Sequence, residues 1–146
     1  MSKTNSWETD LLALLFNNTA ASLIGNAGGL QPSSVAGSLY VSLHTADPGE
    51  AGTQTTSESA YTSYARIAVA RTSGGWTVSG NQVQNTAAIT FPACTAGSST
   101  VTHFGVGTDL SGAGKLLYKG ALTPSISVSS GITPQIPLNG LTVTED

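Results

Sequence analysis

The chain has 146 residues, a length that fits a single domain with a hydrophobic core of its own. Only 9% of the residues are charged, the net charge is −3, and the five Lys and Arg residues are placed singly, so nucleic-acid binding is not expected. No apolar run approaches the roughly 20 residues of a membrane span, and the first ten residues lack the form of a signal peptide. So weakly charged a surface favours contact with other proteins.

The N-terminal segment predicts one short amphipathic helix, over about residues 6–17. Asn5 followed by Glu8 resembles a capping box, with Asn in place of the usual Ser or Thr. Four apolar residues then follow the helical spacing i, i+4, i+7 and i+8, and these are Trp7, Leu11, Leu14 and Leu15. This stripe either packs on the sheet of its own domain or docks on a neighbouring subunit, for which the glycines that follow would act as a hinge.

From residue 37 onward the hydrophobic pattern has the period of two that is typical of strands with one buried face. About eight short segments of this kind, separated by turn signals, predict an all-β, antiparallel β-sandwich with a short N-terminal helix or arm; we favour a jelly-roll-like variant. We divide the chain into a helix and Gly-rich arm, residues 1–32, and a β-sandwich domain, residues 33–146. The predicted strands include residues 39–44, 64–70, 87–91, 100–106 and 116–118, the last of them ended by Gly120.

Chemistry-bearing residues are few and do not form a known motif. His44 alternates with apolar residues, so it is expected to face solvent, and residues 50–60 are expected to form an exposed polar loop. Cys94 is the only cysteine and is expected to be a buried small hydrophobe. We therefore expect no catalytic residues, no cofactor and no metal, although a Ca²⁺ ion at the acidic loops, or a small glycan hydrolase using Asp47 and Glu50, stays an alternative.

Five stretches of the chain resemble a family of small tailed-phage virion proteins, which are labelled capsid cement or decoration proteins and also tail-fibre-like proteins. These stretches are residues 39–49, 87–92, 101–107, 116–120 and 141–146. The resemblance implies a jelly-roll-like sandwich that binds the outside of the capsid as a dimer. It supplies no catalytic residues.

Residues and resemblance together predict a virion structural protein, made in the host cytoplasm and bound to the capsid exterior. Its expected partners are the major capsid protein and further copies of itself, as a dimer, with no nucleic acid and no membrane. The residues expected at the protein interface are Trp7, Leu11, Leu14, Leu15, Asp47 and Glu50. The alternative is a tail-fibre or receptor-binding module that contacts a glycan on the host surface.

Overall fold

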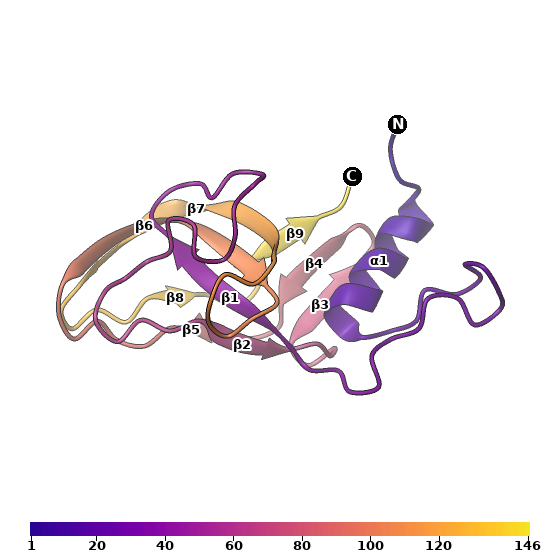
Figure 1. Cartoon of the computed structure of the whole chain (residues 1–146), viewed down its shortest axis with the longest axis horizontal. Helices are drawn as coiled ribbons and strands as arrows, with labels where there is room; N and C mark the ends of the chain where they lie inside the picture. The colour runs from indigo at the N-terminus through magenta and orange to yellow at the C-terminus, as the bar shows by residue number, and fades with distance from the viewer. The chain divides into compact units, whose positions relative to one another are not determined.

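The computed structural model describes residues 1–146 and shows an all-β protein with a single helix, α1 (Asn5–Asn17) (Figure 1). The strands are β1 (Ser38–His44), β2 (Ile67–Ala70), β3 (Trp76–Ser79), β4 (Gln82–Asn85), β5 (Ile89–Thr90), β6 (Ser98–Gly107), β7 (Leu116–Ser129), β8 (Gln135–Ile136) and β9 (Thr142–Thr144). They form three sheets, ordered β2-β1-β6-β7, β3-β4-β9 and β5-β8. The prediction of an antiparallel β-sandwich with a short N-terminal helix is confirmed.

The chain divides into two compact units, each assembled from segments that are far apart in sequence. The first unit contains Met1–Ser38, Val69–Ala88 and Pro137–Asp146, and so holds α1 and the sheet β3-β4-β9. The second unit contains Leu39–Ala68 and Ile89–Ile136, and so holds β6, β7, the β5-β8 pair and nearly all of β1. The predicted division into an arm of residues 1–32 and a sandwich of residues 33–146 stays a prediction.

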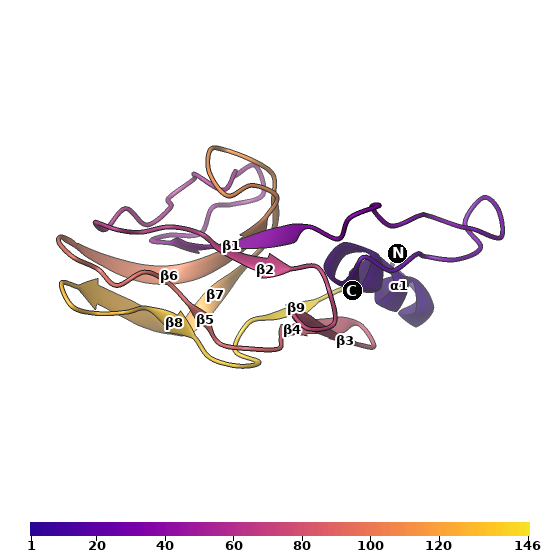
Figure 2. The ribbon, with the colours of Figure 1, turned by 90° about the horizontal axis from the view of Figure 1, so that it is seen from below.

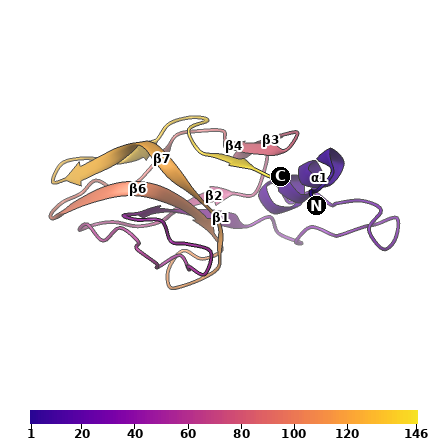
Figure 3. The same ribbon diagram turned by 90° about the horizontal axis from the view of Figure 1, so that it is seen from above.

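In the first unit, α1 lies against β3 and β4 (Figures 2 and 3). Its buried residues are Glu8, Leu12 and Phe16, spaced four apart along one row of the helix. Phe16 meets the fully buried Trp76 of β3 edge to face, with ring centroids 4.9 Å apart. Trp76 is thus a core residue on the side of β3 that α1 covers.

The row that packs on the sheet is not the predicted apolar stripe. All four stripe residues, Trp7, Leu11, Leu14 and Leu15, are only half-buried. The reason is that a buried row containing Glu8 carries no signal in a hydrophobicity pattern, whereas the neighbouring row of leucines does. The helix was therefore predictable and its orientation was not.

The two ends of α1 differ in how their backbone groups are satisfied. At the N-terminus, the cap is Thr4, and its side chain makes no capping hydrogen bond, so the predicted capping box of Asn5 and Glu8 is wrong. The fixed spacing of that motif fails because the helix starts at Asn5 itself, which makes the preceding residue the cap.

The C-terminal end is closed by a left-handed residue and by an arginine from a distant segment. Asn18 has φ 52° and ψ 39°, and its backbone N–H donates to the Ala13 carbonyl. The Arg71 guanidinium donates to the carbonyls of Leu14 (2.7 Å) and Leu15 (2.6 Å). A cation at this end also complements the helix dipole, so Arg71 fixes α1 electrostatically as well as by hydrogen bonds. With its single helix this short, the chain has no helix long and apolar enough to cross a membrane.

In the second unit, the β1–β6 pair carries apolar side chains on one face and polar side chains or glycines on the other. The pairs on the apolar face are Val41–Val106 and Leu43–Phe104, and the pairs on the polar face are Ser42–Gly105 and His44–His103. His44 is nevertheless 0% exposed, so the prediction that it faces solvent is wrong. The loop that follows β1 covers the polar face, which is why residues 50–60 are not a freely exposed loop either: Gln54 and Ser59 are buried.

Several strands also differ from the predicted ones. β2 begins only at Ile67, and β4 was not predicted at all, because its residues are largely polar. Gly120 does not end its strand: β7 continues to Ser129. A Cβ at Gly120 would lie 2.6 Å from ring atoms of Phe104, so this glycine allows two strands to pack closely and does not form a turn.

The packing of α1 gives a direct test with two adjacent leucines. Leu12 is fully buried and Leu11 is half-buried. We expect Leu12→Ala to lower the free energy of unfolding by about 2–5 kcal/mol, and Leu11→Ala to lower it by a small fraction of that, because only the first leaves a cavity. Denaturant unfolding measures both. A larger loss for Leu11→Ala would show that the predicted stripe is the packed face after all.

Candidate interaction surface and buried polar network

The second unit contains a buried ion pair between Arg66 and Glu58. Nε and Nη2 of Arg66 each donate to one carboxylate oxygen of Glu58 at 2.7 Å, which is the two-pronged geometry that a guanidinium and a carboxylate favour. The Arg66 side chain is 3% exposed and that of Glu58 is 15% exposed. The Glu58 carboxylate raises the pKa of Arg66, which stays charged.

The remaining Arg66 donors bind backbone carbonyls of the loop between β6 and β7. Nη1 donates to the Asp109 carbonyl (2.9 Å) and Nη2 donates also to the Gly112 carbonyl (2.7 Å). The Tyr64 hydroxyl donates to Glu58 (2.9 Å) and accepts from the backbone N–H of Leu43 in β1 (3.0 Å). Burial raises the pKa of Tyr64, which keeps this donor protonated. One ion pair therefore holds two loops and a strand together.

Gln54 makes a second link between the same two loops. Its side-chain amide donates to the Asp109 carbonyl (3.2 Å) and accepts from the Asp109 N–H (3.0 Å), while its own backbone N–H donates to the Ala113 carbonyl (2.9 Å). This side chain lies on the sheet at Gly107, where a Cβ would come within 2.2 Å of the Gln54 amide carbon. Only glycine at this position of β6 allows the loop to come this close to the sheet.

His44 is held in one defined tautomer beneath this loop. Nδ1 lies 2.8 Å from the Thr56 carbonyl, which can only accept, so Nδ1 carries the proton and Nε2 accepts from the Ser42 hydroxyl at 2.8 Å. Burial lowers the pKa of His44, and this effect outweighs the Thr56 hydrogen bond and the Glu58 charge, which raise it. His44 is therefore a neutral structural group at neutral pH.

The two acidic residues predicted at the interface, Asp47 and Glu50, lie together on the loop after β1 and share one cation. Lys119 of β7 is 3.0 Å from Asp47 and 3.3 Å from Glu50. The Gly49 N–H, and then Lys119, lower the pKa of Asp47, and the two carboxylates raise the pKa of Lys119. Two carboxylates face one ammonium group, so Lys119 stays protonated and is no nucleophile.

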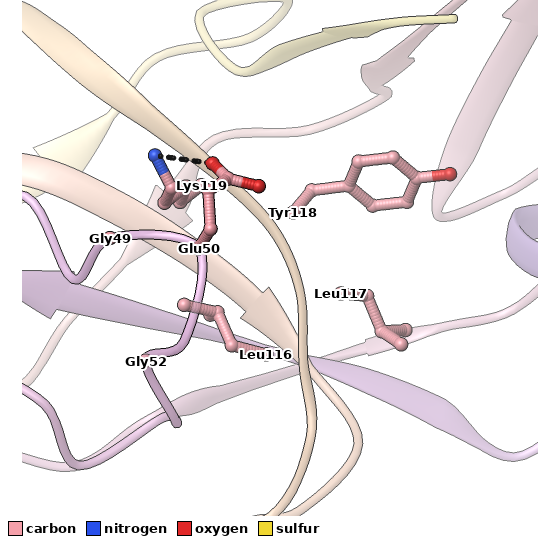
Figure 4. A pocket seen from close by; sticks show the side chains of 7 residues that line it. All are labelled: Gly49, Glu50, Gly52, Leu116, Leu117, Tyr118 and Lys119. Atoms are coloured by element: carbon pink, nitrogen blue, oxygen red, sulfur yellow. Dashed lines mark ion pairs between the residues drawn. The ribbon is translucent and has the colours of Figure 1, made fainter.

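A shallow pocket of about 320 Å³ opens at this ion cluster (Figure 4). Its lining residues are Gly49, Glu50, Gly52, Leu116, Leu117, Tyr118 and Lys119. Figure 4 shows Tyr118 and Leu117 directed away from Lys119 and Glu50. The aromatic ring is therefore not placed as a platform on which a sugar could stack beside the charged groups.

The predicted site residues thus fall into two groups that belong to different units. The helical stripe belongs to the first unit and the pair Asp47 and Glu50 to the second, and their role at an interface stays a prediction. The Arg66 network was not predicted from the sequence. Its only signal was a lone arginine within an alternating strand pattern of a chain with very few charges. Cys94 is buried and free, and no group of three or more His, Cys, Asp or Glu side chains is arranged to hold a metal ion.

Fold and site together define a small all-β protein, in which the buried ionisable groups hold loops in place. A family model described as "Podophage GP4 fiber I protein gp80" matches residues 2–144, and the chain belongs to this family. It is accordingly a phage structural protein. No curated protein matches the chain.

Removing the Arg66 side chain tests the buried ion pair. We expect Arg66→Met to lower the free energy of unfolding by about 3–5 kcal/mol, because the largely buried Glu58 carboxylate loses its charged partner and the Gly112 and Asp109 carbonyls lose the Arg66 hydrogen bonds. Lys119→Met is the matched control, since Lys119 also pairs with carboxylates but at the surface, and it should change stability little. If chemical denaturation shows equal losses of unfolding free energy for the two variants, Arg66 is not the main stabilising contact between the loops.

The buried His44 predicts a loss of stability in mild acid. The pKa of His44 is lowered from its usual 6.5, so below that pH the unfolded chain binds a proton that the folded chain does not. Stability is therefore full above pH 6.5 and falls as the pH drops towards the folded pKa, by at most about 1.4 kcal/mol per pH unit. Unfolding curves between pH 7 and 5 measure this slope, and His44→Gln should remove it. An unchanged slope in that variant would assign the effect elsewhere.

Proposed function

We propose that the chain is a structural subunit of a phage fibre, and that it works by contact with other virion proteins. The observation that carries the proposal is the fibre-protein family match, which spans residues 2–144 and therefore both units of the chain. The low charge of the chain supports it, because a surface with few charges resists contact with neighbouring proteins less than a strongly charged one does.

The chemistry of the site supports a non-catalytic role. Arg66 and Glu58 are bound to each other, Arg66 also binds backbone carbonyls, His44 is buried as the neutral base, and Lys119 is paired with two carboxylates. Each of these groups has its hydrogen-bonding capacity committed to holding loops on the sheet. A reacting substrate would have to displace those bonds before it could use the groups.

A capsid decoration protein is the second candidate, favoured by the resemblance of residues 39–49, 87–92, 101–107, 116–120 and 141–146 to cement proteins. In that role the chain would bind the major capsid protein on the outside of the head, as a dimer. Both candidates need a surface that is covered by protein. They differ in where the protein lies on the particle and in how many copies are present.

Gold-labelled antibody against this protein, applied to purified virions and viewed by electron microscopy, separates the two candidates. We expect label on the tail and a copy number far below that of the major capsid protein, measured by quantitative mass spectrometry of the same particles. Antibody against the major capsid protein is the control for access to the head. Label distributed over the head, in numbers comparable with the capsid protein, would replace the fibre by the decoration role, and absence from virions would refute both.

A further inference from the structure

The connection between α1 and β1 exposes more large apolar side chains than any comparable stretch of the chain. Residues 22–35 are exposed throughout, except for Gly29 and Pro32, which are half-buried. The large apolar side chains exposed there are Leu23, Ile24, Leu30 and Val35, with Leu23 at 80%. Single exposed leucines are common on protein surfaces, but a concentration of them in one short segment is typical of contact sites.

Residues 21–30 of this connection form a hairpin, which loops outward beside α1 (Figure 1). Ala21 and Leu30 exchange backbone hydrogen bonds of 3.0 and 2.8 Å and so close its base. The Asn26 side chain accepts from the N–H groups of Gly28 (2.8 Å) and Gly29 (3.1 Å) and fixes its turn. The hairpin therefore has a defined shape before it meets any partner, which lowers the entropic cost of binding.

The hairpin is also fixed to the first unit. Asn18, at the end of α1, exchanges two hydrogen bonds with the backbone of Ser33, at 2.8 and 2.9 Å. Arg71, which caps α1, donates to the Ala36 carbonyl at 3.1 Å. Both ends of the connection are thus attached to the same unit, so the hairpin is presented by the unit as a fixed feature.

Leu23 adopts a backbone conformation that its side chain does not favour. Its φ is 67°, in the left-handed region where Gly or Asn is the usual residue and a bulky side chain is an outlier. The same side chain is largely in solvent, so neither backbone preference nor burial within this chain accounts for leucine at this position. A contact outside the chain would account for it, since strained residues concentrate at sites of function.

The charge distribution argues against a strongly charged partner and favours a second copy of this chain. There is no Lys, Arg, Asp or Glu between Asp10 and Asp47, so the hairpin lies in the middle of a long uncharged segment. A strongly charged partner would gain no attraction there. Symmetric assembly, in contrast, brings equivalent surfaces of identical subunits together, and any charge near the symmetry axis meets its own copy. An uncharged apolar surface meets no such repulsion.

We propose that the hairpin of residues 21–30 is the surface through which copies of this chain assemble with one another, with Leu23 and Ile24 buried in the contact. The proposal rests on the structural role proposed above. It adds the contact surface and the identity of the occupant, a second copy of the chain. The four-residue stripe on α1 is not needed for it.

The mass of the purified full-length protein tests this proposal by light scattering on a sizing column across a concentration series. The monomer has a mass of 14.7 kDa, and we expect a multiple of it for the unaltered chain. Leu23→Lys should return the mass to that of the monomer, because it removes a buried apolar contact and brings like charges together. We expect the dissociation constant to rise at least about a hundredfold. The matched control is Leu138→Lys, at a leucine that is 58% exposed elsewhere in the first unit, and it should leave the mass unchanged.

A second variant, Leu23→Gly, separates loss of assembly from loss of folding. Glycine adopts a positive φ freely, so the hairpin should keep its shape and the circular dichroism spectrum should stay that of the folded chain, while the mass again drops to the monomer. A monomeric unaltered chain at every concentration, an assembly that survives both Leu23 variants, or an equal effect of Leu138→Lys would each overturn the proposal. These outcomes concern the purified chain alone, so they are independent of where the protein lies on the virion.

Discussion

A buried guanidinium must have its donors satisfied, and this requirement at Arg66 organises the second unit. Its bonds to Glu58, Asp109 and Gly112 fix the loop after β1 and the loop between β6 and β7 on the polar face of the sheet. Arg71 does the corresponding work in the first unit, where it binds the last carbonyls of α1. Both arginines of the chain are therefore used to hold distant segments together by their backbone.

Nearly all basic side chains of the protein are engaged in contacts within the chain. Of the three lysines, Lys3 pairs with Glu145, and Lys119 pairs with Asp47 and Glu50. Four of the five basic side chains are thus engaged within the chain, so little positive charge remains to attract another protein, and the net charge is −3. The same few basic side chains therefore stabilise the units and are withdrawn from contact with other proteins.

The sequence predicted those features that depend on a repeating pattern and missed those that depend on a single distant partner. The period of two along residues 39–43 correctly predicted β1, and the helical spacing correctly predicted α1. The burial of His44 could not be predicted, because it is caused by a loop that folds over the polar face. The orientation of α1 was missed for the same reason: Glu8 occupies its buried row, and only the position of β3 and β4 reveals which row is covered. The candidate site was missed almost entirely, because no local sequence motif indicates an ion pair between Arg66 and Glu58.

For a protein of this kind, shape and apolar contact must supply the specificity that charge does not. Electrostatic attraction mainly raises association rates and selects among partners at long range. A chain with few free charges lacks both effects. Specificity then comes from preformed surfaces that exclude water, which requires that the contacting segment be held rigidly in the free protein. The side-chain bonds of Asn18 and Asn26 provide that rigidity between α1 and β1, at the part of the first unit where apolar side chains are most exposed. In a particle, where each subunit meets the same neighbours many times over, contacts of modest strength suffice because they are repeated.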